Sequence, residues 1–152
     1  MRTIHDEIQQ QTFSSSGQRA VVNVLFTAGW LQDRHADFLK PFGLSVQQFN
    51  ILRILRGQQP KPASIMLLKE RMIDKNSDAS RLVDRLFKKG LVIRRECPSD
   101  RRQMDVTISE AGLSLLAQID RESDQMNRLI QTLTDAEADQ LSYLLDKLRS
   151  EG

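Results

Sequence analysis

The sequence predicts a mainly helical fold that contains one small β-hairpin. Apolar residues recur at helical spacing in about six stretches, which Pro, Gly or capping residues separate. The spacing changes only between residues 91 and 108, where Met104, Val106 and Ile108 alternate with Asp105 and Thr107 as in a strand. A length of 152 residues, 39% of them apolar, suits one compact domain.

Three helices are predicted in the first half of the chain, after a polar arm in residues 1–16. The first covers about residues 18–40 and ends at a Pro. The second, about residues 45–56, begins at a Ser that is placed to cap it. The third covers about residues 64–72, and a tight turn at 73–76 follows it.

The fourth predicted helix, about Asn76–Lys89, has the clearest pattern. Its apolar residues form a stripe at helical spacing that we expect to be buried: Ala79, Leu82, Val83, Leu86 and Phe87. Ser77, Arg81 and Arg85 are spaced by four and form a ridge on the outward side. Such a helix fits the major groove of DNA, where Arg can form two hydrogen bonds with one guanine. The alternative is a solvated helix on which Asp84 pairs with these arginines.

The predicted hairpin has a polar, basic turn between its strands, at residues 96–103. Arg101 and Arg102 are displayed on this turn, and a narrow minor groove attracts such arginines. Asp100 would be repelled by phosphate, so we expect it to act as a brace that pairs with one of the two arginines. The alternative is a charged hairpin that only keeps the protein soluble.

Two further helices are predicted after the hairpin. Ser109 is placed to cap a long helix, and Thr134 and Glu137 form a capping box for the last one. The last helix has an apolar stripe made of Leu141, Leu144, Leu145 and Leu148. This stripe and that of residues 18–40 offer more apolar surface than a small three-helix head can cover, which predicts a dimer.

Charge is distributed unevenly although the net charge is only +2. Residues 69–102 carry 11 basic and 6 acidic side chains, whereas residues 103–152 carry 4 basic and 10 acidic ones. A basic middle beside an acidic tail indicates that one surface meets a polyanion. Two ordinary solvated faces are the alternative.

Two short helices, a tight turn and a hairpin make a winged helix-turn-helix, and two motifs resemble those of the MarR family. The segment SRLVDRLFKKGLV (residues 80–92) is similar to that family's recognition helix and entry to the wing. Asp100-Arg101-Arg102, followed by VTISEAG (106–112), resembles its wing tip and the start of its next helix. The order of elements matches over roughly residues 18–150. Cys97 departs from the pattern, since the family commonly has an acidic residue there.

The resemblance implies a single MarR-type domain over residues 1–152. Dimerisation helices would lie at about 18–40 and 109–150, and the winged helix-turn-helix at about 45–108. It also implies a two-fold dimer with recognition helices in successive major grooves and wings in flanking minor grooves. Arg102 would then be the minor-groove arginine and Asp100 its brace.

We therefore predict a cytoplasmic, sequence-specific regulator of transcription that binds double-stranded DNA as a homodimer. It would act as a repressor on a palindromic operator and need no cofactor. The predicted DNA-binding residues are Lys75, Asn76, Ser77, Ser80, Arg81, Arg85, Arg101 and Arg102. The rival interpretation is a winged-helix protein-interaction module without specific DNA binding. We predict no enzyme, because no acid–base pair, phosphate loop or nucleophile set is found.

Three aromatic residues of the first long helix are candidates for a ligand cleft. Trp30, His35 and Phe38 would line it and bind a small aromatic effector, with ordinary core packing as the favoured alternative. The chain has only two histidines, and we predict no metal site. Cys97 is the single cysteine, so no internal disulfide is expected. Its arginine neighbours would lower the thiol pKa, which makes a redox switch the alternative to a plain surface thiol. No secretory signal or membrane span is expected.

Overall fold

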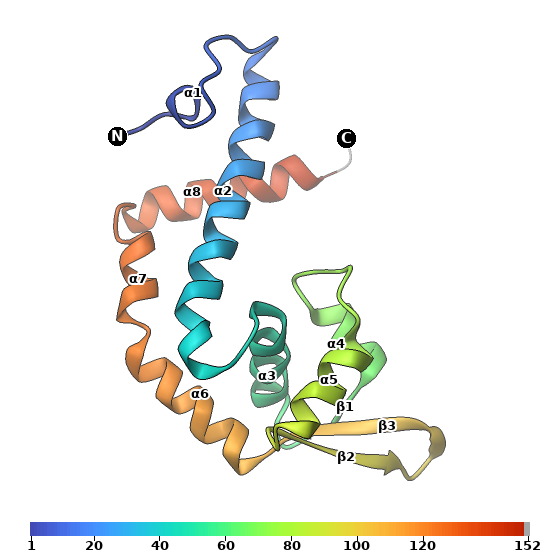
Figure 1. Ribbon diagram of the computed structural model, residues 1–152. Coiled ribbons are helices and arrows are strands. Elements are labelled where there is room, and N and C mark those ends of the chain that lie inside the picture. The colour runs from blue at the N-terminus through green and yellow to red at the C-terminus, as the bar shows by residue number, and fades with distance from the viewer. Residues whose placement is uncertain (151–152) are drawn as a thin grey trace.

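The computed structural model describes residues 1–150 and has the mainly helical architecture with a β wing that the sequence predicted (Figure 1). Residues 151–152 lie outside the described part. The helices are α1 (Ile4–Glu7), α2 (Ser16–Leu39), the 3₁₀ helix η1 (Lys40–Phe42), α3 (Val46–Gln58), α4 (Ile65–Arg71), α5 (Ala79–Lys88), α6 (Glu110–Glu122), α7 (Asp124–Ile130) and α8 (Asp135–Arg149). The strands are β1 (Ala63–Ser64), β2 (Val92–Cys97) and β3 (Asp100–Ile108).

A small head made of α3, α4, α5 and the sheet contains most of the buried core. Each element contributes fully buried aliphatic side chains, among them Ile51, Leu52 and Leu55 of α3, Leu68 of α4, Val83 and Leu86 of α5, and Val106 of β3. Leu116 and Ile119 of α6 extend the same core. The head is therefore held by packing of amphipathic helices against one sheet.

The sheet has three antiparallel strands in the order β1-β3-β2, whereas the sequence predicted only a two-stranded hairpin. The additional strand β1 is two residues long and pairs Ala63 with Val106 and Ser64 with Asp105. A strand this short shows no alternation in the sequence. Only its pairing with β3, distant in the chain, reveals it.

The long helix predicted after Ser109 is interrupted, which corrects the sequence interpretation. Ser109 caps α6 as expected, since its side chain accepts from the Gly112 amide. Ser123 ends α6, and its hydroxyl donates to the carbonyl of Asp120 at 2.7 Å. The chain then turns into α7. A hydroxyl that bonds the backbone in this way competes with the helical ladder.

The two longest helices in the described part of the chain leave many of their apolar residues exposed. In Figure 1, α2 extends far from the head, and α8 crosses α2 in this view. Only Leu39 of α2 is buried, and α8 has no buried residue. Exposed apolar side chains include Val21, Leu25, Phe26 and Trp30 on α2, and Leu141, Tyr143, Leu144 and Leu148 on α8. None of the helices described in residues 1–150 is long and apolar enough to cross a membrane.

Candidate nucleic-acid interface

Helix α5 begins at Ala79, three residues later than the sequence predicted. Its N-cap is Asp78, whose Oδ1 accepts from the Arg81 amide at 3.1 Å. Ser77 therefore precedes the helix instead of lying on its ridge, and its hydroxyl oxygen is buried without a hydrogen-bond partner. An Asp at the N-cap accepts a hydrogen bond from an amide of the first turn. Asp78, and not one of the polar residues before it, therefore caps the helix. The ridge consists of Arg81 and Arg85 alone.

Burial of the apolar stripe points these two arginines outward. Ala79, Val83 and Leu86 are buried in the core, and Leu82 packs against it. Arg81, Arg85 and Ser80 are exposed, as the sequence predicted. Phe87 was expected to be buried but is 42% exposed, and the Arg94 guanidinium covers its ring at 4.0 Å from the centroid.

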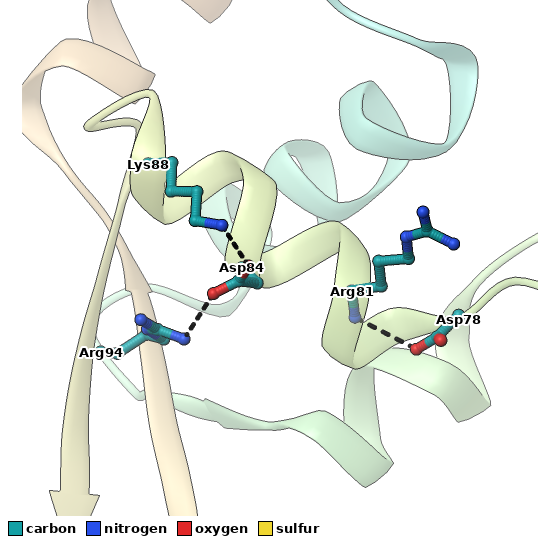
Figure 2. A network of polar contacts seen from close by, with 5 residues as sticks. All are labelled: Asp78, Arg81, Asp84, Lys88 and Arg94. Carbon is teal, nitrogen blue, oxygen red and sulfur yellow. Dashed lines mark hydrogen bonds and ion pairs between the residues drawn. The ribbon is translucent and has the colours of Figure 1, made fainter.

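Asp84 does not pair with the arginines of its own helix. Its Oδ2 lies 3.1 Å from Lys88 Nζ, and its Oδ1 lies 3.3 Å from Nη1 of Arg94 on β2. The hydrogen bond and charge of Lys88, with a smaller effect of Arg94, hold the pKa of Asp84 below its usual value. Figure 2 shows the Arg81 side chain pointing away from this network. Arg81 and Arg85 thus make no ion pair with any described residue, and the alternative in which Asp84 pairs with them is wrong.

The turn before α5 carries the remaining predicted residues of this element. Lys75 and Asn76 are both exposed. The Lys75 ammonium donates to the carbonyl of Glu70, and the backbone amide of Asn76 donates to the carboxylate of Asp74 at 3.0 Å. Both are therefore held near the start of α5, off the helix itself.

A shallow hollow beside α5 adds one residue that the sequence analysis missed. It has a volume of about 220 Å³, and Arg81 and Arg85 line it together with Gln47 of α3. Gln47 lies two residues after the cap Ser45, so it is in the first turn of the first helix of the motif. The order of elements placed this turn next to α5, but no residue pattern singled out Gln47.

The wing differs from its prediction at the tip. Its strands are longer than expected, and the two-residue turn is Pro98–Ser99. Cys97 pairs with Asp100, whereas Glu96 pairs with Met104, so residues 101–103 bulge without partners on β2. Arg101 and Arg102 therefore lie in a bulge at the start of β3 and not on the turn. Bulges commonly re-aim side chains, and both arginines are exposed.

Asp100 contacts Arg102, but through the backbone. Its Oδ1 accepts from the Arg102 amide at 3.0 Å. None of the ion pairs found in residues 1–150 joins Asp100 to a wing arginine. The predicted pairing with a guanidinium is wrong. The carboxylate instead fixes the chain direction within the bulge and leaves the Arg102 side chain free.

Cys97 lies at the edge of the same bulge and is partly exposed. Its Sγ is 3.2 Å from the Ser99 hydroxyl. Hydrogen bonds from the Ser99 side chain, and then from the Ser99 and Asp100 backbone, lower the thiol pKa. The direction agrees with the sequence prediction, but the cause is hydrogen bonding and not the neighbouring arginines.

The candidate ligand cleft divides into two separate hollows. His35 and Phe38 line a cavity of about 480 Å³ between α2, α3, α6 and α7, together with Phe49, Arg53 and Met126. Partial burial lowers the pKa of His35, and the charge of Arg53 adds to this. His35 is exposed and does not belong to the buried core, contrary to the favoured alternative of core packing. Trp30 lies elsewhere, in a hollow of about 590 Å³ between α1 and α2, with the Arg34 guanidinium 4.7 Å from its ring.

No group of three metal-ligating side chains is found within residues 1–150. The ion pair between Arg56 and Asp120, 2.7 Å long, joins α3 to α6 beside the cavity that His35 and Phe38 line. The head is therefore tied to the helices that follow the wing by one exposed charge pair as well as by packing.

Comparisons with known proteins give one consistent result. Residues 44–104, which hold α3 to most of the wing, match the MarR family. A MarR transcription factor from Planctomyces limnophilus is 31% identical, with 89% of this chain and 98% of that one covered at a TM-score of 0.68. The transcriptional repressor MprA of Escherichia coli is 27% identical over 79% of this chain and 69% of its own length. A C80S mutant of MarR from E. coli, solved in complex with operator DNA, is 24% identical and covers 98% of this chain and 100% of its own, with a TM-score of 0.73.

Proposed function

Because the chain belongs to the MarR family of winged helix-turn-helix transcriptional regulators, we propose that it represses transcription by binding a palindromic operator as a homodimer. The chain is a DNA-binding regulator and not an enzyme. The repressor activity is proposed from its relative MprA, whose name states that function. The structure of a MarR mutant with operator DNA supports the mode of binding.

The observation that carries the proposal is the state of the arginines on α5. Asp84 is engaged by Lys88 and Arg94, so Arg81 and Arg85 keep their full positive charge at an exposed surface. Unpaired arginines on a helix of this motif favour base or phosphate contacts in the major groove. Ser80 lies beside them in the first turn and can bond a phosphate.

The wing would supply a second contact in the minor groove. Arg101 and Arg102 project from the bulge at its tip, and Asp100 holds the Arg102 amide. We assign Arg102 to the groove and Asp100 to the brace. Lys75 and Asn76, before α5, would contact the phosphate backbone. Ser77 is the weakest member of the predicted set, because its hydroxyl is buried.

A homodimer would cover the apolar residues that α2 and α8 leave exposed. Leu144 and Leu148 of α8 are 51% and 53% exposed in the single chain. Leaving rows of large aliphatic side chains in water is unfavourable, whereas a two-fold interface buries both copies of each row. Such a dimer would place its two α5 helices on half-sites about one DNA turn apart.

Control by a small molecule is a further part of the proposal. The cavity between α2, α3, α6 and α7 joins aromatic walls, Phe38 and Phe49, to the positive charge of Arg53. A small aromatic effector with an anionic group fits this combination. It would contact both the head and the helices assigned to dimerisation, so it could change their relative position.

The test is selection of duplexes from random DNA by the wild-type protein, followed by anisotropy titrations. We expect enrichment of a roughly palindromic sequence and an affinity that falls steeply as salt rises. The double variant Arg81→Gln/Arg85→Gln should lose the enrichment. A protein that enriches no sequence and binds DNA weakly at all salt concentrations would instead support a winged-helix protein-interaction module.

A further inference from the structure

The recognition helix α5 and the base of the wing share the buried core, and one polar side chain, Arg94, also connects them. Arg94 Nη1 donates to Asp84 Oδ1 at 3.3 Å, and the same guanidinium lies over the ring of Phe87. Both partners belong to α5, whereas Arg94 is on β2. Within residues 1–150, no other side-chain hydrogen bond or ion pair joins α5 to β2 or β3. Figure 2 shows this arginine reaching from the strand to the helix.

Arg94 is poorly placed to contact DNA itself. Its side chain is 28% exposed, its Nε is buried, and its Nη1 is bonded to Asp84. Its chain neighbour Arg95 is exposed and, by strand alternation, projects from the opposite face. The charge of Arg94 is thus directed into the protein, unlike that of the arginines on the ridge and at the wing tip.

The position of Arg94 along the hairpin gives the contact a mechanical role. Arg94 pairs with Val106 of β3, and Val106 also pairs with Ala63 of β1. The sheet has three strands at this level and at the next pair toward the tip, where Asp105 pairs with both Ser64 and Arg95. Beyond it the hairpin continues as two strands to the bulge at Arg101 and Arg102, so contacts at its base set its direction (Figure 1).

We propose that Arg94 is a positioning residue that fixes the wing relative to α5 and thereby makes the protein selective for the spacing of two DNA elements. One element lies under the recognition helix and the other under the wing. We call the contact of Arg94 with Asp84 and Phe87 the clamp. With the clamp intact, the arginines of α5 and those of the wing reach both DNA elements only at one separation. Without it, the wing can realign, so separations that differ by one base pair become similar in affinity. This inference rests on the DNA binding proposed above.

The probe is the duplex that the wild-type protein selects from random DNA. Two derivatives have one base pair added or removed, in each half-site, between the segments that footprinting assigns to α5 and to the wing. At fixed salt, we expect the wild type to bind either derivative about tenfold more weakly, comparable to a mismatched base pair. The Arg94→Gln protein should bind all three duplexes within about threefold of one another, because a mobile wing pays a similar ordering entropy on each.

Arg95→Gln is the matched control. It removes the same charge from the next residue of β2 without touching α5, so it should keep the tenfold preference. Asp84→Asn weakens the same clamp from the helix side and should flatten the preference as Arg94→Gln does. If thermal melting shows that the Arg94→Gln protein does not fold, the Asp84→Asn protein provides the test instead.

Two outcomes would overturn the inference. If the folded Arg94→Gln or Asp84→Asn protein keeps the tenfold preference and only binds every duplex more weakly, Arg94 is an ordinary affinity or stability residue. If Arg95→Gln flattens the preference equally, charge and not position is responsible. Failure of the wild type to select any duplex would refute the proposed function, and this inference with it, whereas the first two results leave DNA binding intact.

Discussion

The substitution Asp100→Ala tests how the wing tip is built, because it has two opposed effects. It removes the acceptor for the Arg102 amide, 3.0 Å away, and so frees the bulge that carries both wing arginines. It also removes a negative charge next to DNA. The first effect weakens binding and the second strengthens it.

The magnitudes favour the first effect. A hydrogen bond to a charged group is worth about 1.5–3 kcal/mol when sheltered, but exposed charged contacts are worth only about 0.2–1 kcal/mol. Asp100 is exposed, so about 0.5 kcal/mol per wing, or about 1 kcal/mol per dimer, is a reasonable loss. Repulsion from a phosphate at about 10 Å amounts to about 0.4 kcal/mol in water, and salt at about 0.15 M reduces it severalfold. We expect binding to weaken by about three- to fivefold.

The assay is an anisotropy titration of the wild-type-selected duplex at fixed salt. Asp100→Asn is the matched variant, because an Asn oxygen can still accept from the Arg102 amide without carrying charge. It should bind within about twofold of wild type, or slightly more tightly. Tighter binding by Asp100→Ala, or equal behaviour of the Ala and Asn proteins, would refute the brace.

Four further predictions follow from the same structure. Arg102→Ala should lower affinity and make the dependence of log K on log salt shallower by roughly one unit per lost contact; an unchanged slope would remove Arg102 from the interface. Arg81→Ala should cost about 1–3 kcal/mol per half-site and relax specificity at one position, as measured by repeating the selection; a uniform loss would assign it to phosphate. Deleting residues 134–152 should give monomer or aggregate and abolish tight binding, and a stable monomer of the intact chain at micromolar concentration, by sedimentation, would contradict the dimer. Gly112→Ala should lower stability by about 1–3 kcal/mol, because a Cβ there would lie 2.4 Å from the Leu91 carbonyl oxygen; an unchanged melting temperature would show that α6 can shift freely.

The predicted elements that proved right are those whose signals are local. Ser45, Ser109 and Thr134 cap α3, α6 and α8 as expected, because a cap depends on residues three positions apart. The stripe of α5 predicted which side faces the core and left Arg81 and Arg85 outside. Phe87 is the exposed member of the stripe: its ring packs under Arg94 of β2 and not in the core.

The sequence by itself determined the order of elements, the family and the exposed arginines of α5, since periodicity, capping and short motifs are properties of neighbours along the chain. Tertiary structure alone decided the pairings across elements. It added β1 to the sheet, directed Asp84 to Lys88 and Arg94, and separated Trp30 from the cavity of His35 and Phe38. These contacts depend on where distant segments meet in space. Several partners of similar charge or size were available to each residue in the sequence, and only packing of the folded chain selected among them.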